Sequence, residues 1–428
     1  MQRTYIGDIL RGRANGREVT VAGWAQDIRN LKNVTFIVLR DSTGRLQVNV
    51  KDQKLRDAVS DLARESVISV SGAIVEEPKS RLGAEIDAYS INILNRSDAP
   101  LPMGVDDPVE ADFETRLNNR FIDLRKPEKA MIFRVESSML WGIRKFLKEQ
   151  GFVEVHSPKI VAAATEGGAE LFPVQYFEKK AYLNQSPQLY KEILMSAGLD
   201  RVFEVGPAFR AEEHNTPRHL NEFTSVDIEV SFADHEDVMG ILENAIGQGI
   251  KQVKEDLGGE LEALSLRMPE ARVPFPRITY ERCLEELSRD GINVNFGEDL
   301  SPEQLRLLGD RMGGFYFITK WPSSLRPFYT MPDPERPEIT NSFDLQFREK
   351  EITSGAQRVH DPKMLEQRFR AKGLNPTDFE FYIKAFRYGM PPHAGWGLGL
   401  ERLVMILLDL PNIREATLFP RDRTRVVP

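Results

Sequence analysis

Three short stretches of this sequence carry charged and glycine residues in patterns suited to binding a phosphorylated ligand. In residues 202–230, Arg210 and Glu212 follow an apolar stretch, and a polar segment with Arg218 and His219 leads into a second one. Two arginines on a strand, loop and strand can bind a polyphosphate, because guanidinium groups match phosphate oxygens bidentately. Taken alone, Arg210 and Glu212 are more simply explained as a surface ion pair.

The second stretch, EITSGAQRVH at residues 351–360, places Glu351, Ser354 and Arg358 close together. Carboxylate and hydroxyl oxygens are the ligands that Mg²⁺ prefers, and the ion usually keeps water and substrate phosphates in its shell. This stretch therefore indicates a magnesium site.

The third stretch, AGWGLGLERLVMILL, is a glycine-rich strand end that runs into a helix with Arg402 in its first turns. Glycines let a flat ring or a phosphate approach the backbone, and Arg402 would add positive charge beside it. The glycines match neither the P-loop nor the dinucleotide fingerprint. By themselves, residues 402–410 are most simply a buried core helix.

The elements that must position these residues follow from the spacing of apolar side chains. Apolar residues recur at helical spacing from Ile132 to Phe146, and Gly151 stands where a helix would end. A strand, FVEVHSP, follows and closes at Pro158. The fold class expected here is α+β, with helices flanking a mostly antiparallel sheet. Further strands are expected at residues 182–184, 202–205, 225–232, 316–318, 341–347 and 351–354.

Residues 19–93 show short alternating segments separated by turn signals, with one polar helix near residues 51–65. Five strands and one helix predict a small Greek-key barrel of the OB type, whose face commonly binds oligonucleotides; an SH3-like barrel is the alternative. Residues 1–50 carry a net charge of +4, which leaves −12 for the remaining 378 residues. We place the barrel domain at 1–97, a hinge at 98–130 and the second domain at 131–428.

Composition excludes several classes of protein. With 41% hydrophobic and 29% charged residues, the chain has a globular composition, and its apolar runs are far shorter than the ~18 residues of a membrane span. The N-terminus lacks a secretory signal, so we expect a cytoplasmic protein. Cys283 is the single cysteine and the six histidines are scattered, which excludes disulfides and Cys/His metal clusters.

In this order, the helix and strand ending at Pro158, the FRAEE segment and GLGLER resemble the three signature motifs of class II aminoacyl-tRNA synthetases. The segments TRLNNRFIDLR, TEGGAELFPV, QSPQLYKE, FRAEEHNTPRHLNEF, SGAQR and YGMPPHAGWGLGLER most resemble the aspartyl-tRNA synthetase family of the archaeal and eukaryotic type, in subclass IIb. About 110 residues separate Val230 from Asn341, which leaves no room for the insertion of the usual bacterial form.

The resemblance implies that an amino acid and ATP form an aminoacyl-adenylate and pyrophosphate, after which the aminoacyl group passes to tRNA. It assigns catalysis to Arg210, Glu351 and Arg402, and Mg²⁺ binding to Glu351 and Ser354. The ATP-binding residues that it implies are Arg210, Ala211, Glu212, Arg218, His219, Leu220, Glu351, Gly399, Leu400, Glu401 and Arg402.

For the amino acid, the resemblance assigns the α-amino group to Glu166, Gln188 and Asp227, and the substrate side chain to Lys191 and Arg358. Two cations aimed at one carboxylate favour aspartate over asparagine. The full set implied for aspartate is Glu166, Gln188, Leu189, Tyr190, Lys191, Arg210, Asp227, Ser354 and Arg358.

For the barrel, the resemblance implies anticodon binding, with Phe36 stacked on the middle base and Arg29 and Gln47 as neighbouring donors. A core position for Phe36 is the alternative. Charging of tRNA(Asp) alone or also of tRNA(Asn) is left open, and we expect Gln26 and the loop at 78–83 to decide it.

The family also implies a homodimer through the helix from Ile132 and the strand to Pro158. An asparaginyl-tRNA synthetase is the nearest alternative, disfavoured by Lys191. An inactive RNA-binding paralogue is disfavoured because the motif residues are present. A tRNA-independent asparagine-making paralogue is disfavoured because such proteins lack the N-terminal barrel.

Overall fold

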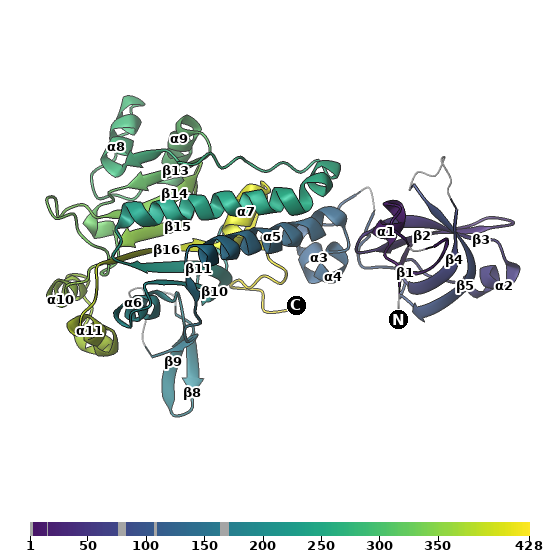
Figure 1. Cartoon of the computed structure of the whole chain (residues 1–428), viewed down its shortest axis with the longest axis horizontal. Coiled ribbons are helices and arrows are strands. Elements are labelled where there is room, and N and C mark those ends of the chain that lie inside the picture. The colour runs from purple at the N-terminus through teal and green to yellow at the C-terminus, as the bar shows by residue number, and fades with distance from the viewer. Residues whose placement is uncertain (1–2, 15, 76–82, 107–108, 163–170) are drawn as a thin grey trace. The chain divides into compact units, whose positions relative to one another are not determined.

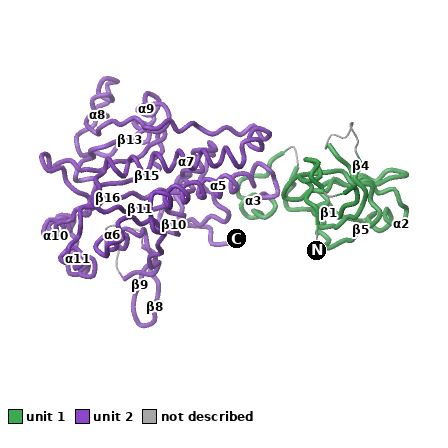
Figure 2. The backbone as a smooth tube through the Cα atoms, viewed as in Figure 1, with its two compact units in different colours: residues 1–122 green, residues 123–428 purple. Residues whose placement is uncertain are grey.

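The computed structural model describes residues 3–14, 16–75, 83–106, 109–162 and 171–428. The chain divides into two compact units, residues 1–122 and residues 123–428 (Figure 2). The expected hinge is thus shared between them: α3 (Phe113–Asn118) belongs to the first unit, and α4 (Arg120–Asp123) reaches the boundary. No helix in the described part of the chain is long and apolar enough to cross a membrane.

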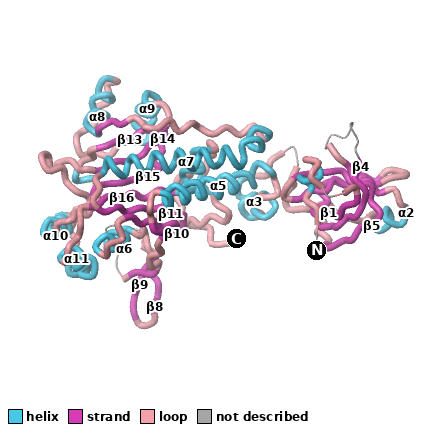
Figure 3. The backbone as a smooth tube through the Cα atoms, viewed as in Figure 1, coloured by secondary structure: helices cyan, strands magenta, loops and turns pink. Residues whose placement is uncertain are grey.

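The first unit contains a closed five-stranded barrel in the order β1-β2-β3-β5-β4 (Figure 3), which confirms the expected OB-type fold. Alternate side chains such as Ile37, Leu39 and Val48 fill the barrel, as period-2 strands require. Its helices, α1 (Ile6–Leu10) and α2 (Gln53–Ala58), are short, and α2 covers only part of the expected 51–65. The strands are β1 (Glu18–Asn30), β2 (Thr35–Asp41), β3 (Gly44–Val50), β4 (Val67–Val75) and β5 (Glu85–Asn95).

The second unit is built on an eight-stranded sheet in the order β12-β13-β14-β15-β16-β11-β10-β6. The neighbours from β13 to β10 pair antiparallel, and only the two outermost pairs, β12 with β13 and β10 with β6, are parallel. The expected mostly antiparallel sheet is confirmed. The strands are β6 (Val153–Glu154), β10 (Arg201–Phe209), β11 (Glu222–Ser231), β12 (Arg277–Thr279), β13 (Phe315–Thr319), β14 (Ser342–Phe347), β15 (Lys350–Gln357) and β16 (His393–Gly399).

Two sequence-based expectations about strands need correction. The strand expected up to Pro158 is paired only at Val153 and Glu154, where it lies parallel to β10. The strand expected at residues 182–184 lies outside the main sheet, in a three-stranded sheet of order β7-β9-β8. Those strands are β7 (Ile160–Val161), β8 (Pro173–Tyr176) and β9 (Lys179–Leu183).

Two long helices, α5 (Pro127–Glu149) and α7 (His235–Ala263), run side by side along one face of the sheet (Figure 1). They share one core with the sheet and with α12 (Leu400–Leu407), in which Val135, Ile246 and Trp396 are almost fully buried. The helix expected from Ile132 to Phe146 is therefore confirmed, and its apolar stripe faces this core. Asp234 caps α7 with a capping box.

Smaller clusters complete the unit. One contains Leu189 of α6 (Gln188–Ser196) with α10 (Pro362–Ala371) and α11 (Glu380–Arg387). Another packs α8 (Tyr280–Arg289) and α9 (Pro302–Met312) against β13. Three single-turn 3-10 helices are η1 (Ser323–Leu325), η2 (Pro376–Phe379) and η3 (Ile413–Ala416).

Candidate active site

A cavity of about 350 Å³ lies in the second unit where β10, β11, β15 and β16 meet the start of α12. It unites the three stretches that the sequence singled out, because β11 and β15 flank β16 on its two sides. The expected residues that line it are Gln188, Arg210, Glu212, Arg218, His219, Leu220, Asp227, Glu351, Ser354, Arg358, Gly399, Glu401 and Arg402.

Glycines of β16 make room for carboxylates of β11. A Cβ atom at Gly397 would lie 3.0 Å from Asp227 Oδ1, and one at Gly395 would collide with Glu229. The pairing explains this, since Asp227 is opposite Gly397 and Glu229 is opposite Gly395. The glycines therefore leave space for acidic side chains to pack against β16, and Gly397 and Gly399 also line the cavity.

One half of the cavity is strongly basic. Arg210, Arg218 and Arg402 all line it, and the Arg210 guanidinium lies 5.5 Å from the centre of the Phe223 ring. Arg402 donates through Nη1 to the backbone oxygen of Glu351 at 3.0 Å. Burial is the largest cause that lowers the pKa of His219; Glu212 opposes it, and the charges of the three arginines add to it. The three arginines around this histidine suit an anionic ligand such as a polyphosphate.

Oxygen ligands lie beside this basic half on β15 and β14: Glu351 and Ser354 line the cavity, and Asp344 is buried next to Ser354. Asp344 is opposite Ser354 in the strand pairing, and its Oδ2 accepts from Arg326 Nη2 at 2.6 Å. Its other oxygen, Oδ1, is buried and has no hydrogen-bond partner. Reduced hydration and the nearby Asp344 carboxylate raise the pKa of Glu351. Two carboxylates and the Ser354 hydroxyl fit a hard divalent cation, and Asp344 Oδ1 is the oxygen among them that has no hydrogen-bond partner.

Sequence reasoning missed Asp344, although polar residues alternate with apolar ones in SFDLQF and so point to one face of β14. Within the described residues, no group of three or more His, Cys, Asp or Glu side chains could hold a metal on its own. A cation at Glu351 would therefore depend on Ser354 and on oxygens of its ligand.

The other half of the cavity contains a buried set of alternating charges. Lys191 Nζ lies 2.9 Å from Asp227 Oδ1 and 3.5 Å from Glu229 Oε2, and it donates to the backbone oxygen of Trp396 at 3.1 Å. Arg358 Nε donates to Glu229 Oε1 at 3.0 Å. Burial opposes the charge of Arg358, but the Glu229 and Glu192 carboxylates outweigh it and raise the pKa of this arginine.

This geometry corrects part of the sequence-based argument. Lys191 is 2% exposed and is not among the residues that line the cavity, whereas Arg358 does line it. Both cations already have carboxylate partners within the protein: Lys191 pairs with Asp227, and Arg358 pairs with Glu229. The acidic partner Glu229 was missed, although it follows Asp227 at the period-2 spacing of a strand.

Behind the cavity, Gln188 is oriented by a buried hydrogen-bond network. Its Nε2 donates to Glu192 Oε1 at 2.5 Å. The other carboxylate oxygen of Glu192 lies 2.8 Å from the Tyr382 hydroxyl and 3.0 Å from His393 Nε2. Because the Gln188 amide nitrogen is held by Glu192, its carbonyl oxygen is the end available to the cavity. The i, i+4 spacing of Gln188 and Glu192 on α6 was the one sequence signal for this network.

The remaining expected residues lie elsewhere. Leu189 and Leu400 are core residues, and the Tyr190 ring packs beside Phe381 with a centroid distance of 6.4 Å. Ala211 lines a separate depression together with Arg421 and Arg423 of the C-terminal segment. Glu166 lies outside the described residues.

On the barrel, Phe36 lies on the outer surface of β2, while its neighbours Ile37 and Leu39 fill the core. The alternative of a core position for Phe36 is therefore wrong. Arg29 is paired with Phe36 across β1 and β2 and is exposed, and Gln47 lies on the adjacent strand β3. These three residues share one outer face.

Gln26 is only 9% exposed, and its side chain is held inside the first unit. It donates to Asp106 Oδ2 at 2.8 Å and accepts from Arg40 Nη1 at 2.9 Å. Most of the loop at 78–83 falls outside the described residues. Gln26 also lines a depression of the first unit together with Asp106.

Comparison with known families yields matches along most of the chain. A profile described as tRNA synthetases class II (D, K and N) matches residues 112–423, and one described as OB-fold nucleic acid binding domain matches residues 19–94. The aspartate–tRNA(Asp) ligase of Thermoplasma acidophilum is 62% identical over 429 residues, with 100% of both chains covered. The aspartate–tRNA(Asp/Asn) ligase of Archaeoglobus fulgidus is 51% identical over 430 residues, also with 100% of both chains covered.

Two solved structures show the same architecture. Asparaginyl-tRNA synthetase from Pyrococcus horikoshii, complexed with asparaginyl-adenylate, superposes with a TM-score of 0.93 at 32% identity and full coverage of both chains. Aspartyl-tRNA synthetase from Entamoeba histolytica superposes with a TM-score of 0.89 at 32% identity, covering 100% of this chain and 93% of its own.

Proposed function

Because this chain belongs to the class II tRNA synthetases of the D, K and N group, we propose that it is an aspartate–tRNA ligase. It activates L-aspartate with ATP and transfers the aspartyl group to tRNA(Asp). The observation that carries this function is the 62% identity to an aspartate–tRNA(Asp) ligase over the whole chain. The overall fold alone does not separate aspartate from asparagine enzymes, since solved structures of both superpose on it.

In the proposed first step, an oxygen of the aspartate α-carboxylate attacks the α-phosphorus of ATP, and the bond to the pyrophosphate oxygen breaks. The products are aspartyl-adenylate and pyrophosphate. Arg210, in the basic half of the cavity, would contact the α-phosphate, and Arg218 and Arg402 would neutralise the leaving pyrophosphate. The cavity contributes position and charge, and no residue forms a covalent bond to substrate.

In the second step, a terminal ribose hydroxyl of tRNA attacks the carbonyl carbon of the adenylate, and AMP leaves. The adenine would lie beside Phe223, with Glu212 accepting from its amino group. Both residues line the cavity, and the aromatic ring offers a flat surface for a base.

Selection of aspartate rests on the buried half of the cavity. Arg358 would bind the β-carboxylate, and Lys191 would set the position and charge of Asp227. The carbonyl oxygen of Gln188 and the Asp227 carboxylate would accept from the substrate ammonium group. A neutral asparagine side chain would leave Arg358 with less compensation, which disfavours it in a partly dry pocket.

Mg²⁺ is the proposed cofactor, with Glu351 and Ser354 as ligands and Asp344 as a further one. When bound, the ion would neutralise charge on the phosphates and hold them in line. The barrel face with Phe36, Arg29 and Gln47 would bind the anticodon, by stacking on the aromatic ring and by donors beside it.

We also propose that the enzyme discriminates in favour of tRNA(Asp). Its relatives at 58–62% identity act on tRNA(Asp) by name, and those at 47–52% identity on tRNA(Asp/Asn). A homodimer through α5 is proposed from the family resemblance, and Trp141 on this helix is 60% exposed in the single chain. We propose a cytoplasmic location, because protein synthesis there uses the aminoacyl-tRNA that such an enzyme makes.

The test is charging of separate tRNA(Asp) and tRNA(Asn) transcripts with labelled aspartate or asparagine in ATP and Mg²⁺. We expect aspartate on tRNA(Asp) alone. Aspartate on both tRNAs would refute discrimination and retain the ligase function, whereas asparagine charging, or none, would refute the proposed substrate.

A further inference from the structure

The loop between β10 and β11, residues 210–221, forms one wall of the nucleotide half of the cavity without any helix or strand of its own. Arg218 and His219 project from it into the cavity, so their positions depend on whatever holds the loop. The described contacts that hold it come largely from a segment about 200 residues later in the chain, residues 412–425.

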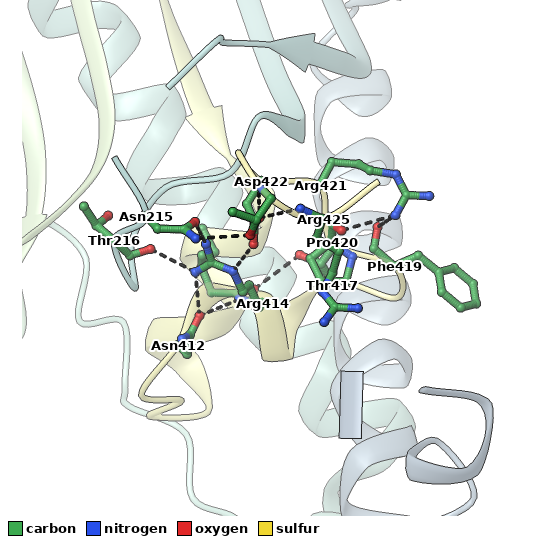
Figure 4. A network of polar contacts seen from close by, with 12 residues as sticks. Asn215, Thr216, Asn412, Arg414, Thr417, Phe419, Pro420, Arg421, Asp422 and Arg425 are labelled. Atoms are coloured by element: carbon green, nitrogen blue, oxygen red, sulfur yellow. Dashed lines mark hydrogen bonds and ion pairs between the residues drawn. The ribbon is translucent and has the colours of Figure 1, made fainter. Parts of the chain in front are cut away.

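Arg414 of η3 is the centre of these contacts and is 7% exposed (Figure 4). Its Nη1 donates to the backbone oxygen of Thr216 at 3.0 Å, and its Nη2 donates to Asn215 Oδ1 at 2.5 Å. Its Nε donates to Asp422 Oδ2 at 2.7 Å. All three guanidinium nitrogens are used, and the planar fork fixes the loop and the C-terminal segment in one geometry.

Backbone hydrogen bonds join the same two segments on either side of Arg414. Ile413 N donates to the oxygen of Pro217 at 2.9 Å, and Asn221 N donates to the oxygen of Arg421 at 2.8 Å. Asp422 in turn is held by Thr424 and Arg425 backbone groups at 2.9 Å. The C-terminal segment is thus itself ordered at the point where it holds the loop.

Thr216 connects this arrangement to the cavity. Its Oγ1 lies 2.6 Å from His219 Nδ1 and accepts from the Arg218 backbone nitrogen at 3.2 Å. A direct chain of contacts therefore runs from Asp422 through Arg414 and Thr216 to the two residues that face the nucleotide.

We propose that Arg414 is a positioning residue for ATP. It does not line the cavity itself and acts through the loop at residues 210–221. It holds the loop in its nucleotide-binding form before ATP arrives, so that less conformational entropy is lost on binding. This inference rests on the proposed function, because it concerns the ATP site of that reaction.

The test is aspartate-dependent ATP–pyrophosphate exchange by the full chain, with the KM for ATP and the KM for aspartate measured separately. We expect Arg414→Ala to raise the KM for ATP by roughly tenfold or more, the scale of lost charge-assisted hydrogen bonds, with the KM for aspartate changed less than about twofold. Arg414→Lys, which keeps the charge without the fork, should fall between wild type and Arg414→Ala.

Arg311→Ala is the matched control, because Arg311 also bonds a backbone oxygen, that of Glu286 at 3.1 Å, and its ion pairs are with Glu286 of α8 and with Asp290 directly after α8, none of which lines the cavity. Its KM for ATP should equal that of wild type. Should Arg414→Ala not fold, Thr216→Val keeps the size of the side chain but removes the hydroxyl that contacts His219 and the Arg218 backbone nitrogen, at the end of the same chain of contacts, and a rise in the KM for ATP is again expected.

A folded Arg414→Ala with the wild-type KM for ATP, or one in which both KM values rise equally, would overturn the inference. Absence of exchange by the wild-type protein would instead overturn the proposed function, so the two failures are distinguishable.

Discussion

His393 and Glu192 form a buried pair at the back of the cavity: His393 Nε2 lies 3.0 Å from Glu192 Oε2, and both side chains are fully buried. The other ring nitrogen, Nδ1, lies 2.8 Å from the backbone oxygen of Pro391, which can only accept. Both ring nitrogens therefore face oxygen acceptors when Glu192 is ionised. Burial opposes ionisation of Glu192, but His393 and then Arg358 outweigh it and lower the pKa of this carboxylate.

This pair predicts a role for Glu192 in aspartate binding. Glu192→Gln would remove the carboxylate that contacts Gln188, Tyr382 and His393 and let the Gln188 amide rotate, so its carbonyl oxygen would no longer be held toward the cavity. We expect the KM for aspartate to rise about tenfold, equal to ~1.4 kcal/mol, with the KM for ATP nearly unchanged. The control is Glu281→Gln on α8, which removes an ion pair with Arg336 away from the cavity lining. Unchanged aspartate affinity in folded Glu192→Gln would contradict this role.

Loss of Lys191 should weaken aspartate activation without preventing ATP binding. Lys191→Met leaves the buried Asp227 carboxylate without its 2.9 Å partner, so this carboxylate, which lines the cavity, loses both its position and its charge compensation. We expect kcat/KM for aspartate to fall by a factor that corresponds to a loss of about 2–3 kcal/mol in transition-state stabilisation. Lys320→Met is the control, since Lys320 bonds Asp333 at 2.9 Å and does not line the cavity. Exchange at the wild-type rate in Lys191→Met would refute the role.

Asp344 should govern the requirement for magnesium. Asp344→Asn keeps the size of the side chain but removes the charge next to Glu351, so the cation would be bound more weakly. We expect the Mg²⁺ concentration for half-maximal exchange to rise roughly tenfold. The measurement is a Mg²⁺ titration of exchange at saturating ATP. An unchanged titration would place the cation away from β14.

Phe36→Ala should affect tRNA and leave adenylate formation intact. Stacking on an aromatic ring is typically worth ~1–3 kcal/mol per base, so the KM for tRNA(Asp) should rise by the corresponding factor, roughly 5-fold to 150-fold. ATP–pyrophosphate exchange without tRNA should be unaffected, which separates this effect from unfolding. Tyr5→Ala, an exposed aromatic of the same unit, is the control. A wild-type KM for tRNA(Asp) in Phe36→Ala would remove Phe36 from the proposed anticodon site.

The Arg414–Asp422 ion pair should give the protein an acid-sensitive term in its stability. Burial opposes ionisation of Asp422, but Arg414 and the Thr424 groups outweigh it and lower the pKa of Asp422 to about 2 from 3.8. A lowered carboxylate pKa stabilises the folded state above 3.8, and this contribution disappears as the pH falls from 3.8 through about 2. Free energies of unfolding measured between these pH values should fall more steeply for wild type than for Asp422→Asn. Parallel pH profiles would contradict the assignment.

The sequence by itself determined the chemistry of the cavity and the type of each main element. Arginines, acids and glycines in three ordered stretches indicate a nucleotide site, and thirteen of the residues singled out in those stretches and beside them do line one cavity. Local periodicity was sufficient for the barrel strands and for α5, because the side chains of a strand alternate and those of an amphipathic helix share one stripe.

Only the tertiary structure decided which of these residues touch, because contacts across a sheet depend on strand order and register. The order β15-β16-β11-β10 brings Ser354, Gly397 and Asp227 together, and no local pattern contains that order. His393 reaches Glu192 across 201 positions, and Arg414 reaches Thr216 across 198. The burial that gives such charged pairs their effect on pKa and on substrate position exists only once these distant segments have packed together.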